Sequence, residues 1–88
     1  MTVHLKVFAM LARKLSSTLK HRYPGGITPG SAIEIDLPDG STLAALLHLL
    51  QLKQDNGFIL LVDGKARKPD YALSEGNEVR IFPPVGGG

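Results

Sequence analysis

Two short stretches, far apart in the sequence, alternate between apolar and polar residues. In TVHLKVF, near the beginning, Val3, Leu5 and Val7 share one face, and in EVRIF, near the end, Val79 and Ile81 do the same. A period of two is typical of a β-strand that is buried on one side only. The chain must therefore form a sheet with one face packed against a second layer.

Two segments between these strands have the spacing of amphipathic helices. Residues 43–50 place leucines at i, i+3, i+4 and i+7, and Ser41 or Thr42 can cap the first turn. Residues 9–20 carry a narrower stripe of leucines, which the sequence RYPGGITPG interrupts. We expect the second segment in the chain, 43–50, to be the main core helix, with Gly57 marking its end.

Three further stretches are expected to join the sheet. IEIDL, from Ile33, alternates in polarity, and FILLV, residues 58–62, precedes an Asp-Gly pair that favours a tight hairpin and a short return strand. A strand covered on one face buries only alternate residues, so either Ile59 and Leu61 or the other three members of FILLV face away from the core. The order of elements predicts an α+β domain with one mixed sheet on one main helix.

Composition excludes several classes of protein. The 88 residues include no cysteine, which rules out disulfides and thiolate metal sites and favours the reducing cytoplasm. No stretch has the length of a membrane span. The net charge of +2 comes without a nucleic-acid motif, and the three histidines, His4, His21 and His48, lack ligand spacing. We therefore expect no metal, nucleic-acid or membrane partner.

The segment IFPPVGGG at the end of the sequence is the most specific feature for function. Pro83 and Pro84 cannot donate ladder hydrogen bonds, so the last strand should end at Phe82 and the chain should leave it extended. Glycine residues can thread a narrow channel and leave a terminal carbonyl open to attack. We expect a domain at residues 1–82 and a tail at 83–88 that a partner captures. The alternatives are a disordered end and a cloning remnant.

Two aromatic residues lie on the outward face of the two alternating strands, opposite the apolar face. If these strands are parallel neighbours, Phe8 and Phe82 meet at the edge from which the tail leaves. We interpret them as a docking patch for a partner, with ordinary exposed apolar surface as the alternative. Lys65, Arg67 and Lys68 form a basic turn that is either simply solvated or complementary to an acidic partner.

Taken together, these features resemble the ubiquitin-like MoaD/ThiS sulfur-carrier family, which includes the small subunit of molybdopterin synthase and the thiazole-pathway carrier. VHLKVFAMLARKL is similar to the first strand and helix of the family, LPDGSTLAALLHLL to its turn and main helix, and LSEGNEVRIFPPVGGG to its closing hairpin and tail. The resemblance implies the β-grasp fold over nearly the whole chain.

The resemblance also implies a reaction at the last residue. In this family a partner resembling ubiquitin-activating enzymes uses ATP to adenylate the terminal glycine, here Gly88 beside Gly87, which then becomes a thiocarboxylate. The implied neck that contacts partners is Phe82, Pro83, Pro84, Val85 and Gly86. The larger synthase subunit and a sulfur donor protein are the other implied partners. The chain would be a sulfur-donating subunit of molybdopterin synthase rather than a complete enzyme, with no permanently bound cofactor.

Other functions stay open at this point. The chain could carry sulfur for thiazole or another product, modify proteins in the manner of ubiquitin, or act as an interaction module without covalent chemistry. It also departs from the family pattern. Gly86 replaces a residue that is often larger, and the loop at 20–32 is longer than expected. Arg13 is the nearest match to an arginine that the family often places after its FA sequence, and we assign it no role from this match.

Overall fold

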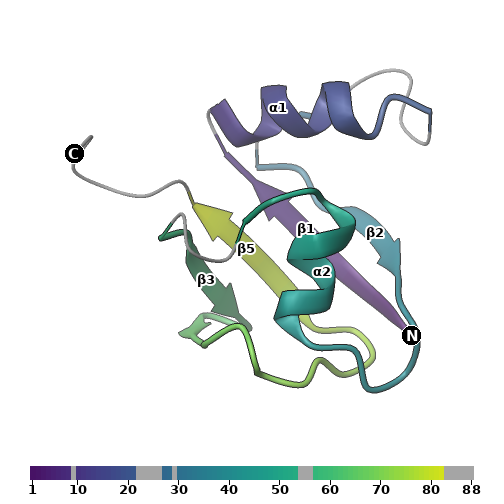
Figure 1. Ribbon diagram of the computed structural model, residues 1–88, viewed down its shortest axis with the longest axis vertical. Coiled ribbons are helices and arrows are strands. Elements are labelled where there is room, and N and C mark those ends of the chain that lie inside the picture. The colour runs from purple at the N-terminus through teal and green to yellow at the C-terminus, as the bar shows by residue number, and fades with distance from the viewer. Residues whose placement is uncertain (9, 22–26, 29, 54–56, 83–88) are drawn as a thin grey trace.

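The elements of the chain are defined in a computed structural model, which describes residues 1–8, 10–21, 27–28, 30–53 and 57–82. The strands are β1 (Thr2–Val7), β2 (Ile33–Asp36), β3 (Ile59–Val62), β4 (Lys65–Ala66) and β5 (Glu78–Phe82), and the helices are α1 (Met10–Thr18) and α2 (Leu43–Leu49) (Figure 1). Within these described ranges, neither helix is long and apolar enough to cross a membrane.

The five strands form one mixed sheet in the order β2-β1-β5-β3-β4. The central strands β1 and β5 are parallel, with Leu5 opposite Val79 and Val7 opposite Ile81. The other neighbouring pairs are antiparallel. This arrangement meets the condition under which Phe8 and Phe82 were expected to come together, and it confirms the predicted α+β, β-grasp fold.

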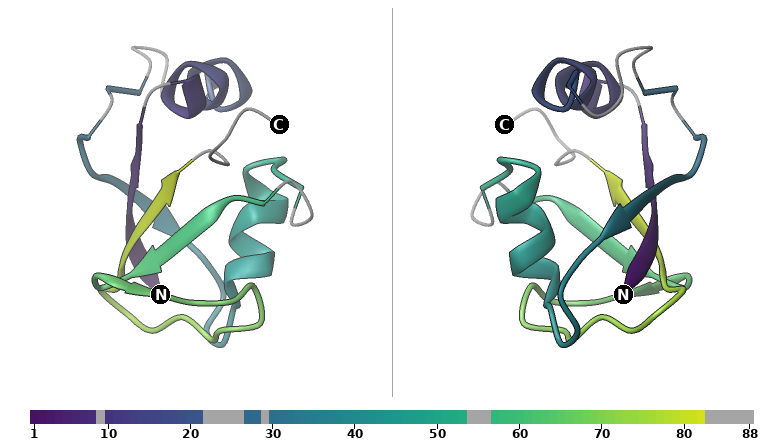
Figure 2. Two further views of the ribbon diagram at one scale, coloured as in Figure 1. Left: turned by 90° about the vertical axis from the view of Figure 1, so that its left-hand side faces the viewer. Right: turned by 90° about the vertical axis from the view of Figure 1, so that its right-hand side faces the viewer.

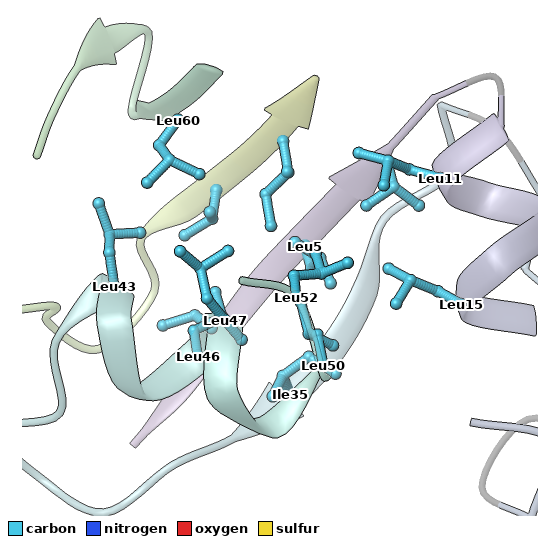
Figure 3. Close-up of a cluster of buried hydrophobic side chains, with 14 of the residues drawn as sticks. Leu5, Leu11, Leu15, Ile35, Leu43, Leu46, Leu47, Leu50, Leu52 and Leu60 are labelled. Carbon is cyan, nitrogen blue, oxygen red and sulfur yellow. The ribbon is translucent and has the colours of Figure 1, made fainter. Parts of the chain in front are cut away.

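Both helices pack into the same core. α2 covers one face of the sheet. α1 lies across one end of the core between α2 and the sheet (Figure 2). Leucines from α2 point toward the sheet, and Leu11 and Leu15 from α1 complete the cluster (Figure 3). The predicted strand parity is also confirmed, because the inward residues of β1 and β5 are fully buried. Such burial of alternate residues fixes which side chains remain on the opposite, open face of the sheet.

The sequence predicted the beginning of α2 correctly and its end wrongly. The Thr42 hydroxyl accepts a hydrogen bond from the Ala45 amide at 3.3 Å, as predicted for a cap. The predicted end at Gly57 is wrong, because α2 ends at Leu49. Gln51 adopts φ 60°, and the Leu52 amide donates to the Leu47 carbonyl at 2.8 Å, which is a Schellman ending. The burial of Leu52 in the core accompanies this early turn.

The connection from α1 to β2 is fastened to the domain at two points. The Ile27 amide donates to the Ser16 hydroxyl oxygen at 2.7 Å, and the Ile27 side chain is buried. Further on, the Gly30 amide donates to the Val7 carbonyl at 2.9 Å. The described part of the long loop is therefore tied to α1 and to the end of β1, and residues 22–26 and 29 lie outside the described residues.

Candidate functional site

Two aromatic rings stack on the open face of the sheet, at the end of β5. β1 and β5 run parallel with Val7 beside Ile81, so the next residues, Phe8 and Phe82, come side by side. Their ring centroids are 4.9 Å apart and their planes differ by 3°. The sequence prediction that these residues meet is confirmed. A stacked pair contributes about 0.5–1.5 kcal/mol beyond its buried area, so it fixes the position of both rings.

The aromatic pair continues onto β3. Ile59 lies opposite Phe82 in the antiparallel pairing, and Leu61 lies opposite Arg80. Leu60 and Val62 are buried, which settles the two alternatives for the apolar run: Ile59 and Leu61 face away from the core. Among the residues that the structure describes, Ile59 is the only large apolar residue that is exposed, at 39%.

We call Phe8, Phe82, Ile59 and Leu61 the apolar patch. Cross-strand neighbours on one face of a sheet lie within contact distance of one another, so the four side chains form a continuous surface across three strands. Sequence reasoning identified the two phenylalanines and did not include Ile59 among the site residues. The available signal was the run of five apolar residues, which is too long for a strand with only one buried face.

A charged row lies next to the apolar patch. The Arg80 Nε donates to the Glu78 carboxylate at 2.6 Å, and the Lys6 Nζ lies 3.7 Å from the same carboxylate. The hydrogen bond from Arg80, reinforced by the charges of Arg80 and Lys6, holds the pKa of Glu78 below its ordinary value. The side chains remain partly exposed, and the row of two cations and one anion keeps a net positive charge beside the patch.

The loop after α1 forms one border of the apolar patch. Gly30 has φ +79°, and a Cβ at this position would lie 3.5 Å from Cε1 of Phe8. A side chain would therefore bring backbone strain, whereas its contact with the ring would be an ordinary van der Waals contact. Glycine lets the loop adopt this conformation, in which the Gly30 amide donates to the Val7 carbonyl.

Other polar residues noted in the sequence lie apart from the patch or at its margin. Lys65, Arg67 and Lys68 are exposed, and the Arg67 guanidinium lies 4.7 Å from the centre of the Tyr71 ring. His4 is half-buried on β1, whereas His21 and His48 are exposed. Over the described ranges of the chain, no group of three or more histidines and carboxylates is placed to hold a metal ion.

The remaining predicted site residues fall in the tail. Pro83, Pro84, Val85 and the three glycines at 86–88 lie outside the described residues. β5 is described as far as Phe82, the last described residue, so the predicted stop of the strand at the prolines stays a prediction. The apolar patch therefore includes the residue that immediately precedes the tail sequence. This places a candidate docking surface and the candidate reactive segment next to each other along the chain.

Comparisons with known proteins agree with this architecture. The ThiS family model matches residues 13–88, which is most of the chain. No curated protein matches the sequence at a significant level.

Solved structures match over almost the whole chain. The crystal structure of SAMP1 from Haloferax volcanii has 22% identity, covers 100% of both chains and gives a TM-score of 0.68. A crystal structure of H. volcanii small archaeal modifier protein 1 has 21% identity, covers 96% of this chain and 98% of that chain, and gives 0.69. A putative molybdopterin converting factor, subunit 1, from Pyrococcus furiosus has 23% identity, with 97% and 99% coverage and a TM-score of 0.67.

Proposed function

The chain belongs to the ThiS family, and from this premise we propose that it is a sulfur carrier that donates sulfur in molybdopterin biosynthesis as the small subunit of molybdopterin synthase. The observation that carries the proposal is the apolar patch at the end of β5, directly before the sequence PPVGGG. The patch would bind partner proteins, and the segment after it would bring Gly88 to their active sites.

The proposed chemistry takes place at the carboxylate of Gly88, with Gly87 beside it. A carboxylate is a poor electrophile, so an activating partner first joins one of its oxygens to the α-phosphorus of ATP and releases pyrophosphate. Hydrosulfide then attacks the carbonyl carbon, the C–O bond to AMP breaks, and a thiocarboxylate remains. The chain has no cysteine, so it has no thiol side chain on which to carry sulfur instead.

The apolar patch supplies the binding energy in this proposal. Aromatic and branched apolar side chains at the centre of an interface often dominate binding, whereas exposed charges contribute mainly to specificity. Phe8 stacks on Phe82 and limits its freedom, so little side-chain entropy should be lost on binding. The proposed partners are an activating enzyme, the larger synthase subunit and a sulfur donor, and the proposed location is the cytoplasm.

The molybdopterin assignment is supported by the Phe-Pro-Pro-Val sequence before the glycines and by α1, which together favour this branch over the thiazole branch. The fold shared with the Pyrococcus furiosus protein agrees with it. A second candidate is a protein modifier, because the similar Haloferax volcanii structure bears the name small archaeal modifier protein 1. In that case a lysine amine, rather than sulfur, would attack the same activated carbonyl.

Reconstitution with three acceptors separates these functions. The thiocarboxylated chain is mixed in turn with the larger molybdopterin synthase subunit and its pterin precursor, and with a thiazole synthase and its substrates. In the third mixture the unmodified chain is added with ATP to a cell extract, in which lysine conjugates are detected. The proposal predicts a sulfur-containing pterin in the first mixture only. Sulfur transfer only to thiazole, or only lysine conjugates, would contradict the molybdopterin role. The chain without Gly87 and Gly88 is the control and should be inactive in all three mixtures.

A further inference from the structure

Two cations border the apolar patch on the open face of the sheet, which is the face opposite α2 (Figure 2). Lys6 and Arg80 lie opposite each other on β1 and β5, and each comes two residues before a phenylalanine of the patch. Arg80 also lies opposite Leu61 on β3. Neighbours two residues apart on one strand are about 7 Å apart, and cross-strand neighbours are closer. Arg80 therefore adjoins the patch on two sides.

Glu78 holds the Arg80 side chain and engages only part of its hydrogen-bonding capacity. One oxygen of the Glu78 carboxylate accepts from the Arg80 Nε at 2.6 Å, and the other lies 3.7 Å from the Lys6 Nζ. A guanidinium has five N–H donors, so the four on the two Nη atoms are left. These four donate to none of the described residues. Glu78 thus orients the guanidinium, which retains donors for a further acceptor.

The other carboxylates around this row have contacts of their own. Asp63 accepts from the Asn77 side-chain amide at 2.7 Å, and Asp36 accepts from the Thr2 hydroxyl at 2.7 Å. Glu34 lies on the edge strand β2 and is engaged as well. Within the described part of the chain, the two cations therefore share a single carboxylate, and one positive charge is in excess. Exposed ion pairs contribute little to stability, so stability does not account for the second cation.

A protein that covers the apolar patch also covers Arg80. The Arg80 side chain is 41% exposed, and its neighbours Phe82 and Leu61 both belong to the patch. Taking charged N–H donors out of water costs free energy unless other acceptors replace the water. Glu78 supplies one acceptor, so the partner must supply the rest. A carboxylate fits best, because its two oxygens match the paired N–H groups of a guanidinium and its charge offsets the excess.

Resting on the proposed function, we propose that Arg80 is a specificity-determining residue of the docking surface and binds an aspartate or glutamate side chain of the partner protein. The occupant of the surface is thus a protein with an apolar centre, which covers Phe82 and Ile59, and a carboxylate beside it within reach of Arg80. The requirement applies to every protein that covers the patch, so each proposed partner that does so should present such a carboxylate. A partner with a cation at this place would be rejected by like charge.

Calorimetric titration against the larger synthase subunit tests the role of Arg80. Arg80→Gln removes the charge and the paired donors, whereas Arg80→Lys keeps the charge alone. The matched control, Arg67→Gln, removes the same charge from an exposed arginine whose guanidinium lies over the Tyr71 ring. We expect Arg80→Gln to raise Kd about ten- to hundredfold, Arg80→Lys to give an intermediate Kd, and the control to change Kd by less than about twofold. Urea unfolding checks that all three variants are folded.

A double-mutant cycle distinguishes a carboxylate of the partner from an indirect effect of Arg80. Each exposed aspartate and glutamate of the larger synthase subunit is changed in turn to its amide. One of these substitutions should weaken binding of the unmodified chain and add almost nothing to the loss in Arg80→Gln. The absence of any coupled residue would overturn the proposal. Unchanged affinity of folded Arg80→Gln, or an equal loss in the Arg67→Gln control, would also overturn it.

Further measurements separate this proposal from other occupants and from the proposed function. Self-association of the chain that Arg80→Gln abolishes, without binding to the synthase subunit, would replace the partner with a second copy of the chain. Tighter binding to a random RNA oligonucleotide than to the subunit would replace the carboxylate with phosphate. Sulfur transfer from the unmodified chain is measured in the same preparations. Its failure alongside a coupled carboxylate counts against the carrier function, whereas sulfur transfer without coupling counts against the role of Arg80 alone.

Discussion

At the scale of single residues, Ile59 is the exposed member of the apolar patch, and its role can be separated from folding. It is 39% exposed on the open face of the sheet, opposite Phe82. Truncating it should therefore remove contact with a partner without leaving a cavity in the core. Leu49 on α2 offers the opposite case, because it is half-buried against the core and away from the patch.

We predict that Ile59→Ala weakens binding to the larger synthase subunit by about 1–2 kcal/mol, as for the apolar centre of an interface. The free energy of unfolding of the Ile59→Ala variant should differ from that of the unmodified chain by less than about 0.5 kcal/mol. Leu49→Ala should do the reverse and lose stability while keeping its affinity. Calorimetric titration and urea unfolding measure the two quantities. Normal affinity of folded Ile59→Ala would show that the patch is not the docking surface.

Glu78 gives the same face a predicted dependence on pH. Its pKa is lowered in the folded domain, chiefly by the hydrogen bond from Arg80. A lowered pKa means that its contribution to stability is present above the ordinary glutamate pKa and is lost as the pH falls through the lowered value. The stability difference between the unmodified chain and Glu78→Gln should therefore shrink on acidification and also with added salt. A difference that grows at acidic pH in unfolding experiments would contradict the assigned ion pair.

At the scale of elements, local patterns predicted the strands and helices well. Alternation gave the buried faces of β1 and β5, and these faces fixed where Phe8 and Phe82 would meet. The outward face of β3 could not be predicted, because all five residues of FILLV are apolar and the choice depends on pairing with β5, a strand distant in sequence. The role of the tail residues was inferred from the chemistry of the sequence, and that role stays a prediction.

The end of α2 shows why helix ends are hard to read from sequence. A left-handed residue usually signals itself as glycine, whereas here Gln51 takes that position with φ 60°. We predict that Gln51→Gly stabilises the domain by about 0.5–1 kcal/mol, because glycine adopts positive φ without strain. Ala45→Gly, an exposed position inside α2, is the control and should cost about 1 kcal/mol. Denaturant unfolding distinguishes the two, and a loss of stability in Gln51→Gly would refute the Schellman ending.

At the scale of the whole molecule, the domain gathers its functional features at one end. Phe8, Phe82 and Ile59 of the apolar patch, with the last described residues of β5, lie toward the end to which β1 and β5 run (Figure 1). The turns that contain Asp63 and Glu75 occupy the opposite end. Every proposed partner would then approach from the same side, because each needs the residues around Phe82.

This arrangement predicts that the partners exclude one another. The activating enzyme and the larger synthase subunit should compete for the carrier, since both would use the apolar patch and the segment after it. Adding the synthase subunit to a preformed complex with the activating enzyme should release that enzyme in size-exclusion chromatography. A stable complex of all three proteins would show that at least one partner binds elsewhere.

The central claim is that the carbonyl carbon of Gly88 is the atom that carries sulfur. Mass spectrometry of the C-terminal peptide tests it most directly, after the chain has reacted with its activating enzyme, ATP and a sulfide source. The account predicts one oxygen replaced by sulfur at Gly88 in the intact chain. An unchanged mass at Gly88, while the activating enzyme still binds the chain and consumes ATP, would contradict it.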